Sequence, residues 1–175
     1  MAKKAIRPIR VEGNVAYVPL TQGYEAIIDA TDVPLVRGFN WWAKVSRRPD
    51  GSVYSVYACR TFGPACEQKR EYMHRALMAG LSDTIDHADG NGLHNTRANL
   101  RAATVSQNMQ NTRLRSNNTS GVKGVSWSPK DKRWYAYINI AGKRHRLGGF
   151  KEIDLATAAI SDARSVLHGE YGRST

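Results

Sequence analysis

Apolar and polar residues alternate along much of the first sixty positions, and β-branched residues are frequent there. Alternation with a period of two is typical of strands that bury one face. Trp41 and Trp42 open one such stretch, and we expect both tryptophans to lie in the core rather than in a functional site. The expected elements are a hairpin over 14–29, a short helix capped by Thr31 and ending at Val36, a strand from Trp41, a turn at 48–51 and a strand over 52–60.

The middle of the chain changes to short helices around a polar loop. Residues 73–79 predict a helix that stops at Gly80, and the following 84–104 are too polar for a core element. Thr104 is a good N-cap, and Gln107 three residues later completes a capping box. This pattern predicts a helix over 105–112.

Residues 113–120 are polar, rich in Ser and Asn and free of apolar anchors, so we expect a linker there. The remainder predicts a small sheet with one helix across it, because three strand-like stretches precede a segment with apolar residues at helical spacing. The expected elements are strands over 123–128, 133–140 and 143–147 and a helix over 154–167. A unit this small buries little surface, so we expect marginal stability in isolation.

Composition indicates a folded protein: of 175 residues, 41% are hydrophobic and 23% are charged. This length accommodates one medium domain or two small ones. No apolar run approaches the ~18 residues of a membrane span, and the basic N-terminus lacks the apolar stretch of a secretory signal. The cysteines, Cys59 and Cys66, are too few for a disulfide scaffold or a four-thiolate zinc site.

Basic residues are concentrated in one part of the chain. The 26 Lys and Arg residues against 15 Asp and Glu residues give a net charge of +11. Residues 101–147 hold ten basic residues and one acidic residue, interleaved with aromatic residues on sequence that is not amphipathic-helical. This arrangement favours a nucleic-acid partner over a membrane. A solvated basic surface is the alternative.

Asp, His and Asn residues crowd the segment 86–108, and three interpretations compete. The segment could be a loop whose side chains bond their own backbone. A zinc site on Asp86, His87 and His94 is disfavoured, because the spacing matches no helical metal motif and no thiolate is present. A hydrolytic site would combine carboxylate and amide oxygens for a Mg²⁺-type cation with an imidazole that takes a proton from water. Neighbouring Asp86 and His87 would point to opposite sides of an extended strand.

The stretch 86–101 (DHADGNGLHNTRANLR), followed by Ser106-Gln107-Asn108, resembles the motif of HNH endonucleases. It is most similar to the phage and intron-encoded homing-endonuclease branch, in which asparagine replaces the last histidine. The spacings of 13 residues from Asp86 to Asn99 and nine from Asn99 to Asn108 fit that branch, as does the preceding Met73-His74-Arg75. The resemblance implies a ββα-metal fold, with two strands and a helix holding one divalent cation.

The resemblance also implies roles for individual residues. His87 would be the general base, Asp86 and Asn108 would be metal ligands, and Asn99 would orient the loop and the base. The cation would be Mg²⁺, with Mn²⁺ as the alternative. His94 stands where the family usually has Asp, so it receives no chemical role. For His74, structural packing and phosphate contact both stay open.

The last third resembles the APETALA (ethylene-response-factor) DNA-binding domain, in which a three-stranded sheet enters the major groove and a helix packs behind it. The sequence departs from the plant pattern at Ser126, usually arginine, and at Arg146, usually tryptophan, which affects base specificity. The matching residues are Gly124-Val125, Trp134, Ala136, Arg144, Leu147-Gly148, Phe150 and the alanine-rich helix.

Together these patterns predict an α+β protein with a β-rich N-terminal segment and ββα-metal nuclease core over 1–112 (motif 72–112), a linker over 113–120, and an APETALA-type domain over 121–175. The expected partner is double-stranded DNA, with no membrane and no obligate protein partner, so the protein would be a monomer in the cytoplasm of a phage-infected bacterium. The expected DNA-contacting residues are His74, Arg75, Arg101, Arg113, Lys123, Trp127, Lys132, Arg133, Trp134, Arg144 and Arg146.

The predicted function is therefore a metal-dependent homing endonuclease that nicks or cuts duplex DNA. The main alternative is a non-catalytic, sequence-specific DNA-binding regulator with a vestigial nuclease motif. An RNA-binding protein is the third hypothesis, although no RNP-type aromatic strand pattern supports it.

Overall fold

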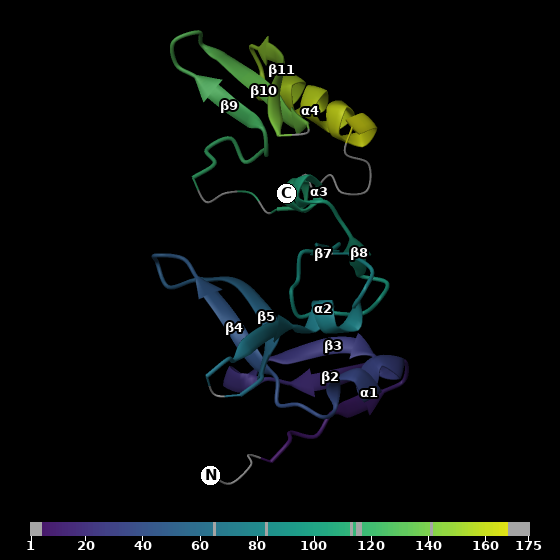
Figure 1. Cartoon of the computed structure of the whole chain (residues 1–175). Helices are drawn as coiled ribbons and strands as arrows, with labels where there is room; N and C mark the ends of the chain where they lie inside the picture. Colours follow the sequence, from purple (N-terminus) through teal and green to yellow (C-terminus); the bar gives the residue numbers. More distant parts are fainter. Residues whose placement is uncertain are drawn as a thin grey trace. The chain divides into compact units, whose positions relative to one another are not determined.

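The computed structural model of the chain describes residues 5–64, 66–82, 84–112, 114, 117–140 and 142–167 (Figure 1). Contacts divide the chain into two compact units, 1–102 and 103–175, and each is described by itself. Both combine small antiparallel sheets with few helices, which confirms an α+β fold. Within the described residues, no helix is long and apolar enough to cross a membrane.

The first sheet of unit 1 contains the predicted hairpin, extended by one strand. Its strands β1 (Arg10–Glu12), β2 (Val15–Pro19) and β3 (Glu25–Asp29) pair antiparallel in chain order. The hairpin turn is a 3-10 turn, η1 (Thr21–Gly23), and a second, η2 (Ala30–Asp32), leads into α1 (Val33–Val36). The prediction that Thr31 caps this helix is wrong, because Thr31 lies inside η2 and Asp32 occupies the N-cap position.

The second sheet of unit 1 is a meander of β4 (Trp42–Arg47), β5 (Val53–Phe62) and β6 (Lys69–Tyr72). Strand β6 was not among the expected elements. Cross-strand partners share a face, so the register Trp42↔Cys59↔Tyr72 defines one face and Ala43↔Ala58 defines the other. The second of these faces is buried at Ala43 and Ala58, which are almost inaccessible.

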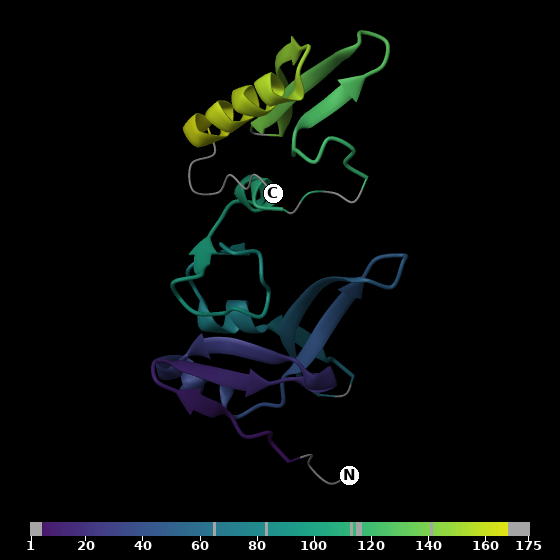
Figure 2. The same cartoon turned by 180° about the vertical axis from the view of Figure 1, so that it is seen from behind.

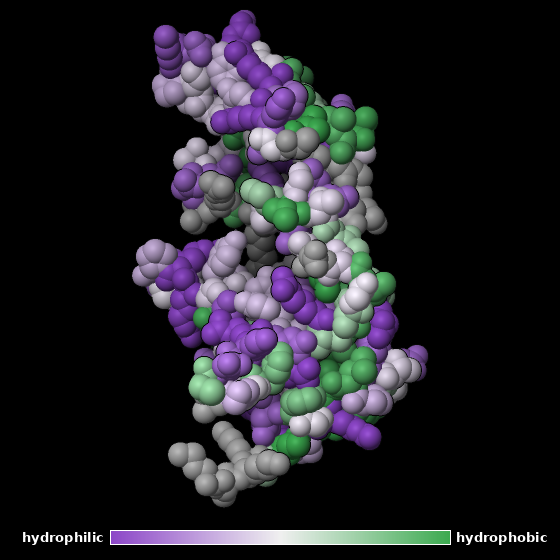
Figure 3. Space-filling model, viewed as in Figure 1, coloured by the Kyte–Doolittle hydropathy of each residue, from purple (hydrophilic) through white to green (hydrophobic). Residues whose placement is uncertain are grey.

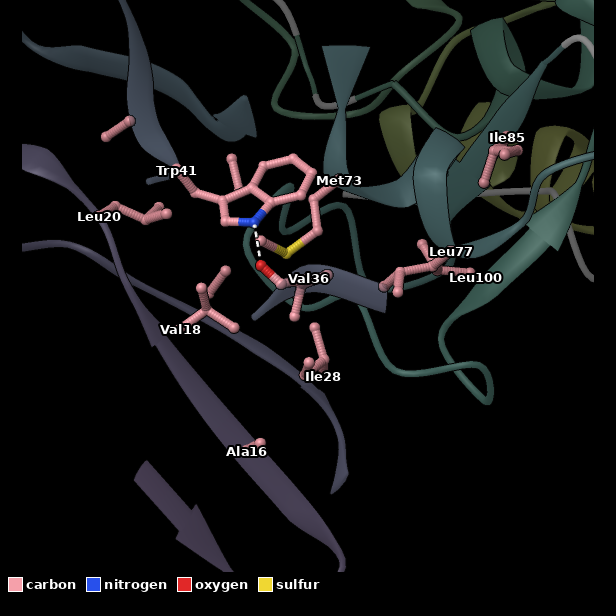
Figure 4. Packing of buried hydrophobic residues seen from close by; sticks show 13 residues of the cluster. Ala16, Val18, Leu20, Ile28, Val36, Trp41, Met73, Leu77, Ile85 and Leu100 are labelled. Atoms are coloured by element: carbon pink, nitrogen blue, oxygen red, sulfur yellow. Dashed lines mark hydrogen bonds between the residues drawn. The ribbon is translucent and has the colours of Figure 1, made fainter. Parts of the chain in front are cut away.

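One apolar cluster holds the two sheets and α2 (Met73–Leu77) together. Trp41 lies at its centre, 1% exposed, and its indole Nε1 donates a 3.1 Å hydrogen bond to the carbonyl of Val36 (Figure 4). A buried indole with a satisfied N–H adds a large apolar area without an unpaired donor. Trp41 is therefore a core residue, as expected, whereas Trp42 lies on the other face of the sheet and is partly exposed.

The predicted helix at 73–79 is confirmed in a shorter form as α2, and it is followed by a two-stranded sheet. Strands β7 (Ile85–His87) and β8 (Leu100–Ala102) pair antiparallel with the register Asp86↔Arg101 and His87↔Leu100. The polar loop 88–99 connects them, and its Asn95 backbone N–H donates to the Ile27 carbonyl at 2.7 Å. The loop is thus fixed to strand β3 as well as to its own strands.

Unit 2 begins with α3 (Val105–Gln110), where the predicted capping box of Thr104 and Gln107 is present. A three-stranded sheet follows, with β10 (Arg133–Ile140) between β9 (Val125–Ser128) and β11 (Lys143–Phe150). Helix α4 (Ile153–Leu167) lies across one face of this sheet (Figure 2) and packs Ala156 and Ile160 against it. Strand β11 is longer than the predicted 143–147, because a bulge beside Ala136 and Tyr137 lets it continue to Phe150.

The boundary between the units differs from the predicted one at 112. The contact division falls after Ala102, so α3 belongs to unit 2. One cause is Lys123, whose Nζ donates to the carbonyls of Gln110 and Thr112 at 2.6 and 2.8 Å. These bonds tie the end of α3 to the segment before β9.

Candidate functional site

His87, the predicted general base, is a buried residue at the end of β7. Its Nε2 lies 3.1 Å from Asn95 Oδ1, an acceptor, so the neutral ring donates its proton there. That bond keeps the proton on Nε2 and makes Nδ1 the basic nitrogen. Burial lowers the pKa of His87 despite the opposing effect of Asn95, so the ring is uncharged at neutral pH. A neutral, oriented imidazole is the form that a general base requires.

Two further rings contact His87, and a third stacks on one of them. The His74 ring meets it edge-on at a centroid distance of 5.1 Å, and Tyr57 of β5 lies 5.9 Å away. Tyr72, at the end of β6, stacks on His74 at 5.4 Å. His74 was expected to contact DNA, with packing as the alternative, and its position between Tyr72 and His87 is a packing position.

Burial, followed by the nearby His87 and Arg75, lowers the pKa of His74 to about 3. In the unfolded chain an ordinary histidine takes up a proton near pH 6.5, which folded His74 does not do. The free energy of unfolding is therefore expected to fall as the pH drops from 7 to 5, and this fall should be smaller in His74→Gln. Chemical denaturation at both pH values tests this, with the exposed His145→Gln as the control. An equal pH dependence in the wild type and His74→Gln would contradict it.

Asp86, the predicted metal ligand, faces away from His87, as expected for neighbours on a strand. Its Oδ2 accepts hydrogen bonds from Arg101 Nε and Nη2 at 2.9 and 2.8 Å. Asp86 is 4% exposed, so the carboxylate of this ion pair is buried, whereas the Arg101 side chain stays partly accessible. Arg101 was predicted to contact DNA, but in this structure its guanidinium neutralises Asp86.

Asn99 fixes the shape of the loop between β7 and β8. Its Nδ2 donates to Asp89 Oδ1 at 2.9 Å and to the carbonyl of His94 at 2.7 Å, while its Oδ1 accepts from the Asp89 backbone N–H. This geometry agrees with the loop-orienting role that the resemblance implies for Asn99. The side chain that holds the His87 ring is Asn95, which the sequence did not single out. The Nδ1 atom of His94 lies 2.7 Å from Asp89 Oδ2, within hydrogen-bond distance, and the His94 side chain is partly exposed.

The loop lies directly against β5 at Gly92. A Cβ atom at Gly92 would lie 2.5 Å from two ring carbons of Tyr57 and from the carbonyl oxygen of Val56. Gly92→Ala is therefore expected to lower the free energy of unfolding by about 1–3 kcal/mol and to disturb the His87 site. Gly38→Ala is the control, because no atom lies within 4 Å of its Cβ position. Denaturant unfolding measures both, and equal stabilities would show that the loop does not rest on Tyr57.

The two residues predicted to hold a metal carry oxygen donors. Asp86 and Asn108 offer a carboxylate and an amide oxygen, which suit a hard divalent cation such as Mg²⁺. Asp86 lies in unit 1, and Asn108 lies on α3 of unit 2. No group of three or more His, Cys, Asp or Glu residues that could hold a metal occurs in the part of the chain that the structure describes. Asp86 and Asn108 each offer an oxygen atom of the kind that such a cation prefers.

The sheet of unit 2 presents basic and aromatic residues on the face opposite α4. Arg144 lies over the ring of Tyr137 at 3.8 Å from guanidinium carbon to centroid, and Arg146 lies over Tyr135 at 4.0 Å. The register pairs Tyr137 with Arg146 and Asn139 with Arg144, so all four stacked residues share that face. Stacking on a ring holds a guanidinium in place while its N–H groups stay available to phosphate or bases.

Other predicted DNA contacts of unit 2 lie elsewhere. Trp127 pairs with Trp134, which packs against the core beneath α4, so both tryptophans lie on the helix side rather than with Arg144 and Arg146. Lys123 binds the end of α3, as described above. Lys132 lies exposed in the turn before β10, and Arg133 donates to the Gly149 carbonyl at 3.1 Å. Arg113 lies outside the described residues, and Arg75 of unit 1 is exposed.

Sequence reasoning missed four residues of this site: Tyr57, Tyr72, Gly92 and Asn95. Tyr57 and Tyr72 come from strands of the N-terminal sheet, and no local motif connects them with His87. The alternation of β5 does place Tyr57 and Cys59 on one face. The alternation of β5 therefore predicts that Tyr57 and Cys59 share a face, but it does not predict that His87 contacts Tyr57.

These features define a two-unit α+β protein with a buried histidine site in one unit and an open basic and aromatic sheet in the other. No protein-family profile matches the chain, and no solved structure matches it. Among curated proteins, it is 40% identical over 91 residues to protein 3.8 of Escherichia phage T7. The aligned region covers 51% of this chain and 73% of the phage protein. The chain belongs to the same family as that phage protein, whose name states no activity.

Proposed function

We propose that the protein is an HNH-type endonuclease that hydrolyses phosphodiester bonds of double-stranded DNA. The observation that carries this proposal is the state of His87: neutral, buried, and oriented by Asn95 within a loop that Asn99 fixes. The order of the elements also supports it, since β7, β8 and α3 follow one another as in a ββα motif. Membership of a phage protein family fits action inside an infected bacterium.

In the proposed reaction, His87 Nδ1 takes the proton from the attacking water. Asn95 holds the ring so that this nitrogen, rather than Nε2, is basic. Around it, Tyr57 and His74 exclude bulk water on the side of the β4–β5–β6 sheet. Because burial keeps the imidazole neutral, the base is ready over the whole neutral pH range.

Asp86 and Asn108 are the proposed ligands of one divalent cation, Mg²⁺ or Mn²⁺. When bound, such a cation would act as a Lewis acid on the scissile phosphate and stabilise the departing 3′ oxygen. Arg101 occupies Asp86 Oδ2 in this structure, so it would have to release that oxygen or share the carboxylate. A guanidinium that moves from Asp86 to a DNA phosphate would reconcile the predicted DNA contact of Arg101 with its bond to Asp86 in this structure.

Unit 2 is the proposed DNA anchor. Its open sheet face carries Arg144 and Arg146 on a platform of Tyr135 and Tyr137, without α4 covering it. A two- or three-stranded sheet fits the major groove of B-DNA. The ββα-metal core, the APETALA-type role and the monomeric state all belong to this proposal.

Nicking of supercoiled plasmid and phage DNA tests the function. The wild type is expected to nick with Mg²⁺ or Mn²⁺ and to lose activity in excess chelator. Asp86→Ala should lose activity at all metal concentrations, whereas Asn108→Ala should recover in part at high metal, because a neutral ligand contributes less than a carboxylate. Cleavage that persists in chelator, or in both variants, would overturn the metal-dependent mechanism.

One observation favours the second candidate, a DNA-binding regulator without catalysis. The Asp86 carboxylate is buried against Arg101, and a permanent ion pair there would leave no ligand for a metal. In that case the wild type would bind duplex DNA without nicking it under any divalent cation. Mapping of cut ends on digested phage DNA would separate the two candidates.

A further inference from the structure

One face of the β4–β5–β6 sheet carries polar, basic and aromatic residues with no acidic residue among them. The register Trp42↔Cys59↔Tyr72, Lys44↔Tyr57 and Thr61↔Arg70 identifies the residues that share it. We call it the Lys44 face, and its members are Trp42, Lys44, Ser46, Ser55, Tyr57, Cys59, Thr61, Arg70 and Tyr72. Hydrophilic residues gather on the surface over β4 and β5 (Figure 3).

Both cations of this face are held by aromatic rings. Lys44 Nζ donates to the Tyr72 hydroxyl at 2.5 Å and lies 5.1 Å from the centre of that ring. The Arg70 guanidinium lies 5.2 Å from the Trp42 ring, and the Trp42 indole donates to Thr61 Oγ1. Rings that hold a cation in place reduce the entropy it loses on binding an anion.

Neither cation is neutralised. Within the described residues, neither Lys44 nor Arg70 forms an ion pair with a carboxylate, whereas Arg60 on the opposite face is paired with Glu71. Between the two cations lies Cys59, which is fully buried, and burial raises its pKa to about 11 although Lys44 and Arg70 act in the opposite direction. The two positive charges thus lie on either side of Cys59, and no member of this sheet face carries a negative charge.

The Lys44 face continues into the His87 site. Tyr57 lies on this face. The centroid of its ring lies 5.8 Å from that of Tyr72 and 5.9 Å from those of His74 and His87. The chain of contacts therefore runs from Lys44 through Tyr72 and His74 to His87. All of these residues belong to unit 1, so their arrangement does not depend on unit 2.

We propose that the Lys44 face binds the sugar–phosphate backbone of duplex DNA beside the phosphodiester bond that the water activated by His87 attacks. This inference rests on the proposed nuclease function and gives the N-terminal sheet a role in it. Two cations without an ion pair in the described residues, on a sheet face whose members include no carboxylate, match the repeated charge of a phosphate backbone. The Trp42 and Tyr72 rings are occupied by Arg70 and Lys44, so the face contacts phosphates rather than stacking on unpaired bases.

Charge-removing variants of the full chain test this inference. Lys44→Met and Arg70→Met keep much of the apolar stem over each ring and remove only the charge. Lys69→Met is the matched control, because Lys69 lies exposed on β6 and its partner Phe62 places it on the opposite face. The probe is a mixed-sequence 30-base-pair duplex without divalent metal, and anisotropy at several salt concentrations gives the salt slope of log K.

Each of Lys44→Met and Arg70→Met should reduce the magnitude of that slope by about 0.9, and the double variant by about 1.8, whereas Lys69→Met should leave it unchanged. Slopes equal to that of Lys69→Met would overturn the inference. Because Lys44 bonds Tyr72, thermal melts check its folding, and Arg70→Met alone suffices if Lys44→Met is unfolded.

The binding readout separates this inference from the proposed function. A reduced slope with no nicking by the wild type would support the Lys44 face and reject the nuclease. Nicking by the wild type with unchanged slopes would retain the nuclease and reject the Lys44 face. If the variants also lose nicking, the loss should appear mainly in KM for the DNA, since neither residue contacts the attacked bond.

Discussion

Replacing His87 with alanine is expected to lower the nicking rate by about 10²–10⁴-fold while DNA affinity changes only a few-fold. A general base contributes this much to rate and little to ground-state binding. The imidazole is also buried beneath Tyr57 and His74 and offers DNA little surface. Single-turnover nicking gives the rate, and anisotropy with the same duplex gives the affinity.

His94→Ala is the control for this prediction, because His94 lies in the same loop but is partly exposed, within hydrogen-bond distance of Asp89. Its nicking rate should stay within about tenfold of the wild type. Burial lowers the pKa of His87, so the acid limb of the wild-type pH–rate profile should lie below the ordinary histidine value near 6.5. Wild-type nicking rates in His87→Ala between pH 6 and 8 would exclude His87 as the base.

Elements with a complete local signal could be predicted from the sequence. The capping box of Thr104 and Gln107 lies within four residues, and the structure contains both of its hydrogen bonds. The hairpin over 14–29 and the three strands of unit 2 follow from alternation between turn residues, so their existence was predicted even where their ends were not. Such signals depend only on neighbours in the chain.

Long-range pairings could not be predicted in the same way. Strand β6 is four residues long, and Glu71 and Tyr72 acquire their places from partners on β5. Asn95 was one asparagine among several in a polar loop, and only the fold selects it as the partner of His87. Trp42 was assigned to the core with Trp41, but consecutive strand residues face opposite sides, and Trp42 belongs to the Lys44 face.

Charge counts predicted a nucleic-acid partner without showing which cations are available to it. Lys123 and Arg101 both belong to the basic segment 101–147, yet one binds carbonyls at the end of α3 and the other binds Asp86. Conversely, Lys44 and Arg70 lie in the N-terminal part, where acidic residues nearly balance the basic ones. A count along the sequence averages over faces, whereas binding depends on which charges share a face and lack a partner.

The second large effect is expected in unit 2, from replacing Arg144 and Arg146 together with alanine. Both guanidiniums are held on tyrosines of the open sheet face, so the change removes two positioned cations without touching the core beneath α4. If both contact phosphates, the salt slope of log K should fall in magnitude by about 1.8. If they contact guanines, each should cost about 1–3 kcal/mol of discrimination between sequences.

The control for this pair is Lys143→Ala with His145→Ala on the same strand. Their partners Ile140 and Ile138 place them on the helix side of the sheet, so the control also removes two exposed side chains from β11. Anisotropy titrations of the full-length variants at several salt concentrations give the DNA affinity and the salt slope of log K. Only the arginine double variant should bind DNA more weakly and with a flatter slope. Equal salt slopes and equal discrimination between sequences in both double variants would mean that the open face does not hold DNA. The stacked arginines would then act inside unit 2, and DNA affinity would have to come from unit 1.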